Sequence, residues 1–166
     1  RVINGESKYI FLIIFFQKKY YFSVTLINST FEKNQAYSFS NALDIQCQNL
    51  VINFCIFTNN TPFLLTWRSM GGALYAHLQK FLINNTCFIG NINEAGGAIF
   101  LEQHTKYSTL IGIFEKVRGI KNQAYNNGIF LGLSTGILSS HISYFSSTFE
   151  GNYGSARTFL LNYLIF

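Results

Sequence analysis

The chain has 166 residues, of which 17% are aromatic and 11% are charged, with 18 Phe, 10 Tyr and a single Pro. This length suits one domain with a sizeable core, and the scarcity of Pro and of charged residues excludes a disordered chain. The net charge of +5 is scattered, and its longest basic run is Lys18-Lys19, so we expect no nucleic-acid partner.

The first predicted element is the apolar run at 9–16, which is flanked by Lys8 and Lys18-Lys19. This run and a second one at 159–166 are far shorter than the roughly 20 residues of a membrane-spanning helix. The first run could be the apolar part of a signal peptide, but no small-x-small cleavage site follows it closely. We therefore predict a buried strand or the coil that starts the solenoid, with 1–23 as an N-terminal strand or cap region, and no transmembrane segment.

Short segments with alternating apolar residues recur from residue 24 onward, for example at 24–27, 50–53 and 81–84. Alternation of β-branched and aromatic residues between Asn and Gly is typical of strands. A helical-repeat solenoid would need longer windows with a period of 3.6 residues, and Gly and Asn interrupt nearly every such window. The segments therefore favour β-structure.

A Phe that lies three residues before an Asn (FxxN) follows these segments. The Asn recurs in steps of 26, 31, 31 and 30 positions, a period typical of solenoids. In the fourth repeat, Gly119 takes the place of the Phe. The residues of the pattern are Phe31, Phe57, Phe88 and Phe149, and Asn34, Asn60, Asn91, Asn122 and Asn152.

A second pattern, small-small-Ala-aliphatic, alternates with the first. Its full forms are GGAL at 71–74 and GGAI at 96–99, and its eroded forms lie at 40–43, 127–129 and 154–156. Gly allows a bend with positive φ, and Ala is small enough to point into a crowded interior. Each repeat therefore contains two or three short strands separated by tight turns.

Together the repeats predict an all-β fold, a parallel β-helix solenoid of about five coils in which 1–166 form a single segment. Each position in such a fold lies about 4.8 Å above its counterpart one coil earlier. We therefore expect the repeated Phe residues to form an interior stack and the repeated Asn residues a hydrogen-bonded ladder at a corner. We also expect the segment to be part of a longer chain.

FxxN in register with GGA[ILV], over roughly 24–160, resembles the repeat of the chlamydial polymorphic outer-membrane proteins and of related β-helix surface proteins in microbial eukaryotes. The resemblance implies a right-handed β-helix of the passenger type and a role in surface display and adhesion. The sequence departs from the pattern in the missing fourth Phe and in the eroded Gly-Gly of coils one, four and five.

Chemistry-bearing motifs are few, so we predict no enzyme, no catalytic, cofactor-binding or metal site, and no cofactor. The string at 132–136 matches GxSxG around Ser134, but no Asp follows it and no His follows Glu150. Pectin-degrading β-helix hydrolases and esterases place two or three Asp residues on adjacent coils, and this chain has only Asp44. Glu32, Glu115 and Glu150 are expected at solvated turns.

Cys47, Cys55 and Cys87 lack the CxxC spacing of metal or redox sites, and the three His residues are far apart in sequence. We expect buried free thiols, with a Cys55–Cys87 disulfide as the alternative. Glycosylation sequons begin at Asn28, Asn59 and Asn84. The candidate exposed aromatic residues for sugar or protein contacts are Trp67, Tyr75, Tyr107, Tyr125 and Tyr153.

The sequence thus predicts a structural or adhesive module at the cell surface or outside the cell. Its expected partners are proteins, including copies of itself bound through coil ends or faces, and glycans. Two alternatives stay open: a carbohydrate-active β-helix enzyme of the lyase or hydrolase type, and an intracellular scaffold subunit of a large assembly.

Overall fold

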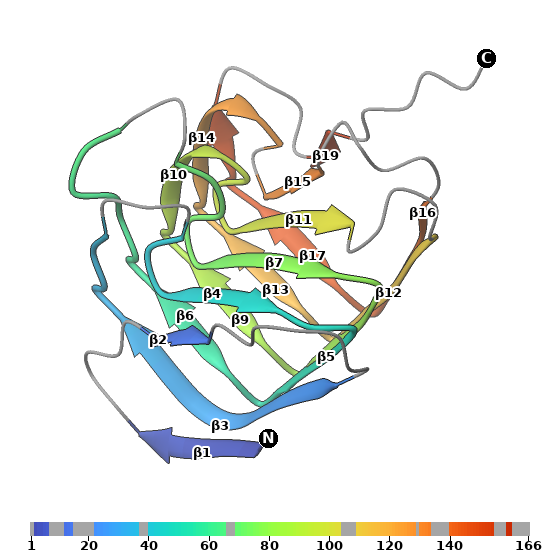
Figure 1. Cartoon of the computed structure of the whole chain (residues 1–166). Helices are drawn as coiled ribbons and strands as arrows, with labels where there is room; N and C mark the ends of the chain where they lie inside the picture. The colour runs from blue at the N-terminus through green and yellow to red at the C-terminus, as the bar shows by residue number, and fades with distance from the viewer. Residues whose placement is uncertain are drawn as a thin grey trace.

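A computed structural model describes residues 2–6, 12–14, 22–36, 40–65, 69–103, 109–128, 130–133, 140–154 and 159–160. Within these ranges every regular element is a β-strand, and the strands pair in parallel. The strands form four walls around one apolar core (Figure 1). We number the walls in the order in which the chain meets them.

Each wall is built from one strand of each successive turn. The first wall contains β3 (Ser23–Glu32), β5 (Asn49–Asn53), β8 (Lys80–Asn84), β12 (Leu110–Glu115) and β16 (Ser140–Phe145), with β1 (Val2–Glu6) beside β3. The second wall contains the end of β3 and then β6 (Ile56–Thr58), β9 (Cys87–Ile89), β13 (Arg118–Ile120) and β17 (Thr148–Glu150). The third wall contains β10 (Ile92–Ala95), β14 (Gln123–Asn127) and β18 (Tyr153–Gly154). The fourth wall contains β2 (Leu12–Ile14), β4 (Leu43–Gln46), β7 (Leu74–Leu78), β11 (Ile99–Gln103), β15 (Leu131–Leu133) and β19 (Phe159–Leu160).

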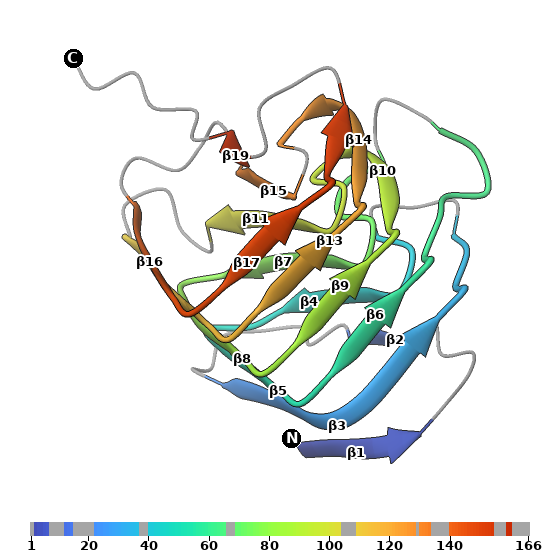
Figure 2. The ribbon, with the colours of Figure 1, turned by 180° about the vertical axis from the view of Figure 1, so that it is seen from behind.

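The fold is the predicted right-handed parallel β-helix. In Figure 1 the chain climbs from the N-terminus at the bottom while β4, β7 and β11 run from left to right in front. Figure 2 shows β6, β9, β13 and β17 returning across the opposite side, which gives a right-handed winding. Among the described residues the turns at 80–103, 110–133 and 140–160 have all four strands, and the turns at 23–46 and 49–78 have fewer. Where about five coils were predicted, the structure thus has three full turns and two reduced ones, preceded by β1 and β2.

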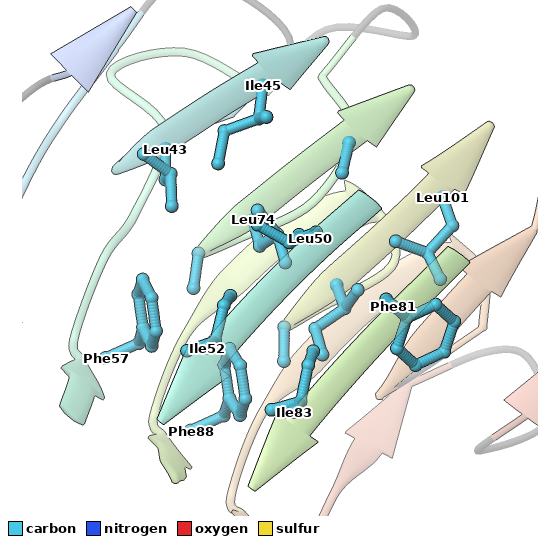
Figure 3. Close-up of a cluster of buried hydrophobic side chains, with 14 of the residues drawn as sticks. Leu43, Ile45, Leu50, Ile52, Phe57, Leu74, Phe81, Ile83, Phe88 and Leu101 are labelled. Carbon is cyan, nitrogen blue, oxygen red and sulfur yellow. The ribbon is translucent and has the colours of Figure 1, made fainter. Parts of the chain in front are cut away.

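The core lies between the first two walls and the fourth. Alternate residues of β5 and β8, such as Leu50, Ile52 and Ile83, point inward and are at most 1% exposed. Figure 3 shows Leu43 and Leu74 of the fourth wall pointing toward them. The predicted strands at 24–27, 50–53 and 81–84 are confirmed, because β3, β5 and β8 contain them.

The repeated asparagines form a continuous amide ladder at the corner between the second and third walls. Each Nδ2 donates to the Oδ1 of the Asn one turn later, at distances of 2.8, 2.8, 2.9 and 2.9 Å along the series. The Nδ2 of Asn60 also donates to the carbonyl of Phe31, and that of Asn91 to the carbonyl of Phe57, both at 3.0 Å. Since Asn60, Asn91 and Asn122 are fully buried, the ladder satisfies backbone groups that water does not reach.

The predicted aromatic stack is present in the first three of its four positions. The rings of Phe31, Phe57 and Phe88 lie parallel with centroid distances of 4.7 and 4.8 Å, which is the spacing of the strands. Gly119 pairs in register with Phe88, as expected for a fourth repeat without its Phe. The stack therefore stops at Phe88, and Phe149 does not continue it directly.

Phe130 fills the space that Gly119 leaves. Its ring contacts Phe88 edge-on at 5.7 Å and Phe149 at 4.5 Å, and it is fully buried. Phe130 precedes β15 at the position that Ala98 occupies before β11, because Leu131 pairs with Ile99. The third turn has Phe88 in the second wall and Ala98 before the fourth wall. At the same two positions the fourth turn has Gly119 and Phe130, so the large side chain comes from the other side of the core.

Two corners of each turn use a residue in the left-handed conformation. The corner between the first and second walls has φ of 46° to 53° in every turn, and the corner after the second wall has φ of 53° to 62°. The first set is Asn28, Phe54, Asn85, Lys116 and Ser146, and the second set is Lys33, Asn59, Gly90, Lys121 and Gly151. The chain therefore bends at fixed backbone positions whose side chains vary.

The Gly-Gly pattern has two separate physical causes. Gly71 has φ of +73°, which disfavours other residues. A Cβ on Gly72 would lie 1.8 Å from the carbonyl oxygen of Gly97 on the next turn, so only Gly allows the two turns to approach. Ala73 and Ala98 then point into the core and are fully buried, as predicted.

We expect Phe130→Ala to destabilise the fold by about 3 to 5 kcal/mol, because it leaves a cavity beside Gly119. Gly119→Phe alone should also destabilise, since even a Cβ there would lie 2.5 Å from the Phe130 ring. Combining the two changes should recover part of the loss, and urea unfolding of all four proteins measures the coupling. Additive effects would contradict the proposed exchange.

We expect Asn91→Ala to cost about 3 kcal/mol or more, because it strands the buried amide of Asn60 and the carbonyl of Phe57. Asn152→Ala is the matched control, because Asn152 is only partly buried and water can replace its contacts. Its cost should be less than half as large in the same urea unfolding experiment. Equal costs would show that the ladder does not depend on burial.

Candidate functional site

The outer face of the fourth wall brings together polar side chains from three turns. Strand alternation turns Asp44, Tyr75 and Phe100 outward in one column, since their strands pair in register. Gln46, His77 and Glu102 form the next column by the same pairings.

A short hydrogen bond joins the two columns. The hydroxyl of Tyr75 donates to Oε2 of Glu102 at 2.6 Å, a distance typical of a charge-assisted bond to a carboxylate. His77 contacts the backbone carbonyl of Gln103 through Nε2. The hydroxyl of Tyr75 is thus held by a carboxylate on the next turn.

Apolar contacts cover the Tyr75 ring although it lies on the outer side of the wall. It stacks on Phe100 with a centroid distance of 6.3 Å and an angle of 12°, and the two are 9% and 5% exposed. Ala95 and Met70 complete this small cluster. The ring of Phe100 lies over Gly132 on the next turn, where a Cβ would come within 2.5 Å of it. The polar groups therefore stand beside a dry apolar patch.

This setting raises two pKa values. Burial, and secondarily the charge of Glu102, raise the pKa of Asp44 from 3.8 to about 6. Burial also raises the pKa of Tyr75, and its hydrogen bond to Glu102 and the charges of Glu102 and Asp44 add to the effect. The phenol therefore remains a neutral donor at physiological pH, while Asp44 exchanges its proton near pH 6.

The arrangement can hold a proton donor and an acceptor on one surface. Asp44 supplies a carboxyl group that is protonated below about pH 6, and Glu102 supplies a carboxylate that accepts from Tyr75. Asp44 and Glu102 are two turns apart, which separates their backbones by roughly 10 Å. Among the described residues, no group of three or more His, Cys, Asp or Glu side chains could hold a metal ion.

The sequence pointed to Asp44 as the one Asp but missed its neighbour Glu102. The feature that relates the two residues is the pairing of β4, β7 and β11. In this register Glu102 lies two residues beyond the position that aligns with Asp44. The three glutamates singled out in the sequence do not gather. Glu32 and Glu150 share a column of the second wall but are four turns apart, and Glu115 lies on the first wall.

The alternative of a Cys55–Cys87 disulfide is wrong, because all three cysteines are free thiols. Cys87 pairs with Ile56 rather than with Cys55, and the Cys55 N–H donates to Oγ1 of Thr86 at 3.3 Å. Cys55 is buried in the core, whereas Cys87 is only partly buried. Burial raises the pKa of Cys47 to about 12 and also raises that of Cys55, so both thiols stay protonated.

Two of the three sequons lie on exposed corners. Asn28 and Asn59 are exposed and have left-handed φ of 49° and 54°. Asn84 ends β8, is partly buried, and accepts from the amide of Asn85 at 2.9 Å. Asn28 and Asn59 are therefore the better placed glycan acceptors.

The candidate exposed aromatic residues differ in their surroundings. Tyr125 and Tyr153 are 42% and 53% exposed, whereas Tyr75 is buried in the cluster described above. Trp67, Tyr107 and Ser134 of the GxSxG string lie outside the described residues. Two tyrosines thus remain as surface aromatic groups for contacts.

Comparison of the chain with protein-family models, with curated proteins and with solved structures gave no match. Across the ranges that the structure describes, no helix has the length and apolar character needed to cross a membrane. Functional inference therefore rests on the geometry of the chain itself.

We expect Asp44→Asn to stabilise the protein at pH 7 by about 1 to 2 kcal/mol. This is less than the full free energy of the raised pKa, because Asp44 is only partly buried and solvent screens its charge. The folded state binds a proton at Asp44 more tightly than the unfolded state, so stability falls as pH rises from about 4 through 6. The variant should lose this slope and match the wild type below pH 4 in urea unfolding. Glu150→Gln, an exposed carboxylate on another wall, is the control. An unchanged slope in Asp44→Asn would refute the assignment.

Proposed function

We propose that the chain is a structural and adhesive module of a cell-surface or extracellular protein, which contacts proteins, copies of itself or glycans. The proposal is supported by the contacts of the recurring residues, because the Asn ladder and the Phe stack join one turn to the next. A chain whose repeats serve mainly to extend a stiff rod is suited to spacing and display. This proposal includes membership of the polymorphic outer-membrane protein-like repeat family.

The single observation that carries the proposal is the open side of the turn at 140–154. Tyr144 occupies the inward position that Phe114 holds one turn earlier, yet it is 41% exposed whereas Phe114 is fully buried. Within the described part of the chain no strand pairs with the far side of β16, β17 or β18. An open strand edge beside an apolar surface favours pairing with a further strand, which a copy of the chain can supply.

We expect self-association to increase with protein concentration in sedimentation velocity, from micromolar to near-millimolar protein. Tyr144→Arg should abolish it, because a charge would be placed at the centre of the open turn. Tyr125→Arg is the matched control, since Tyr125 is 42% exposed but lies on the third wall. A wild type that stays monomeric throughout would refute self-assembly, and equal effects of the two variants would refute the open turn as its site.

The second candidate function is that of a carbohydrate-active enzyme, and the position of two carboxyl groups, Asp44 and Glu102, on the same outer face favours it. Glycoside hydrolysis needs one protonated and one ionised carboxyl group, which inverting enzymes hold about 6.5 to 9.5 Å apart. The raised pKa of Asp44 and the bond from Tyr75 to Glu102 would suit these two roles.

We expect this activity to release reducing ends from acidic or neutral polysaccharides at pH 5 to 6 and to vanish in both Asp44→Asn and Glu102→Gln. Glu115→Gln, on the first wall, is the control. Release of sugar that both variants retain, or no release at all by the wild type, would leave adhesion as the only function proposed.

A further inference from the structure

The second turn carries an insertion that the later turns lack. Asn60 of the ladder and the left-handed Gly71 are eleven positions apart, whereas Asn91 and Gly96 are five apart. Figures 1 and 2 both show residues 61–65, after β6, projecting sideways from the body of the solenoid. We call residues 61–65 the apolar loop.

The apolar loop exposes three consecutive large apolar side chains. Phe63, Leu64 and Leu65 are 55%, 59% and 45% exposed. On β5, β8 and β12, alternation sends every second residue inward, so an exposed apolar side chain there lies between buried neighbours. The loop thus concentrates apolar surface at a convex point instead of spreading it over a flat wall.

Hydrogen bonds hold the loop at both of its ends. The N–H groups of Thr61 and Phe63 donate to the carbonyls of Asn34 and Ala36 at 3.1 and 3.0 Å. Ser69 donates through Oγ to the carbonyl of Leu64 at 3.5 Å. A loop tied to the first turn in this way presents its apolar side chains in a defined position, so little order has to be gained on binding.

The charge of this segment favours an anionic lipid surface as the partner of the apolar loop. No Asp or Glu occurs between Asp44 and Glu94, so the whole second turn and its loop carry no carboxylate. The net charge of the chain is +5. Anionic lipid headgroups therefore meet no repulsion from this segment, and a short convex apolar segment can enter the boundary between headgroups and acyl chains.

We propose that the apolar loop inserts Phe63, Leu64 and Leu65 into the interfacial region of a lipid bilayer and holds the solenoid against a membrane surface. An aromatic ring beside aliphatic side chains suits this zone, where apolar burial and headgroup contact occur together. The insertion uses residues of the second turn only.

The test is cosedimentation with phosphatidylcholine vesicles and with vesicles that contain phosphatidylserine as well. We expect the wild type to bind both, more strongly when phosphatidylserine is present. Phe63→Ser combined with Leu64→Ser should weaken binding by about tenfold or more, since each change removes apolar surface from the bilayer. The single tryptophan, Trp67, follows Leu65 by two residues, so its fluorescence should be quenched by brominated acyl chains.

Phe54→Ser is the matched control, because Phe54 is 54% exposed but lies at a corner of the body, outside the loop. It should bind vesicles as the wild type does. A wild type that ignores both vesicles, or a double variant that binds as well as Phe54→Ser, would overturn the proposal. Vesicle binding that depends on phosphatidylserine alone and survives the double variant would assign it to surface charge instead.

Discussion

The asparagine ladder is the interaction on which the rest of this structure depends. At the corner after the second wall the ladder Asn is buried beside a corner residue of left-handed conformation, so the N–H and carbonyl groups around it must find partners away from water. One buried amide does this for three turns: that of Asn91 accepts from Asn60, donates to Asn122, and donates to the carbonyl of Phe57. The ladder therefore sets the height and the register of the turns at one point. Strand pairing and ring stacking at 4.7 to 4.8 Å follow from that register.

Within this register the core conserves volume rather than residue identity. The fourth turn lacks the stacking Phe at Gly119 and supplies a ring from the opposite wall at Phe130. The same turn also has Gly112 under the ring of Phe81, where a Cβ would come within 2.0 Å of it. Each glycine of this kind accepts an aromatic ring from a neighbour, so close packing is kept while the position of the ring changes. A repeat can thus lose its signature residue and still stack on the next one.

The sequence predicted those structural features that arise from contacts between residues one repeat apart. FxxN and Gly-Gly-Ala recur at nearly constant spacing, and the strands, the ladder and the first three rings of the stack follow from that spacing. Phe130 could not be predicted, because its partner Gly119 lies across the core and no periodic pattern relates the two. That Glu102 shares a face with Asp44 was missed for a related reason: the loops between β4, β7 and β11 differ in length, so the register that aligns these strands is visible only once they are paired. The corner column of Asn28, Phe54 and Lys116 shares a backbone conformation but no side-chain chemistry, which leaves no pattern to read.

The division between a constrained interior and a free exterior explains where function can arise on such a chain. Since the ladder closes each turn at the start of the third wall, the residues between that corner and the fourth wall can change in number without disturbing the register. The second turn uses this freedom for a loop with three exposed apolar side chains, and the strands on either side of it still pair with their neighbours. The outer face of the fourth wall uses it differently, by holding the partly buried carboxyl group of Asp44 near Glu102 at a cost in stability above pH 6. Both features are unfavourable for folding by themselves, and nothing in the repeat requires them, so contact with a partner outside the solenoid is the physical reason that we assign to them.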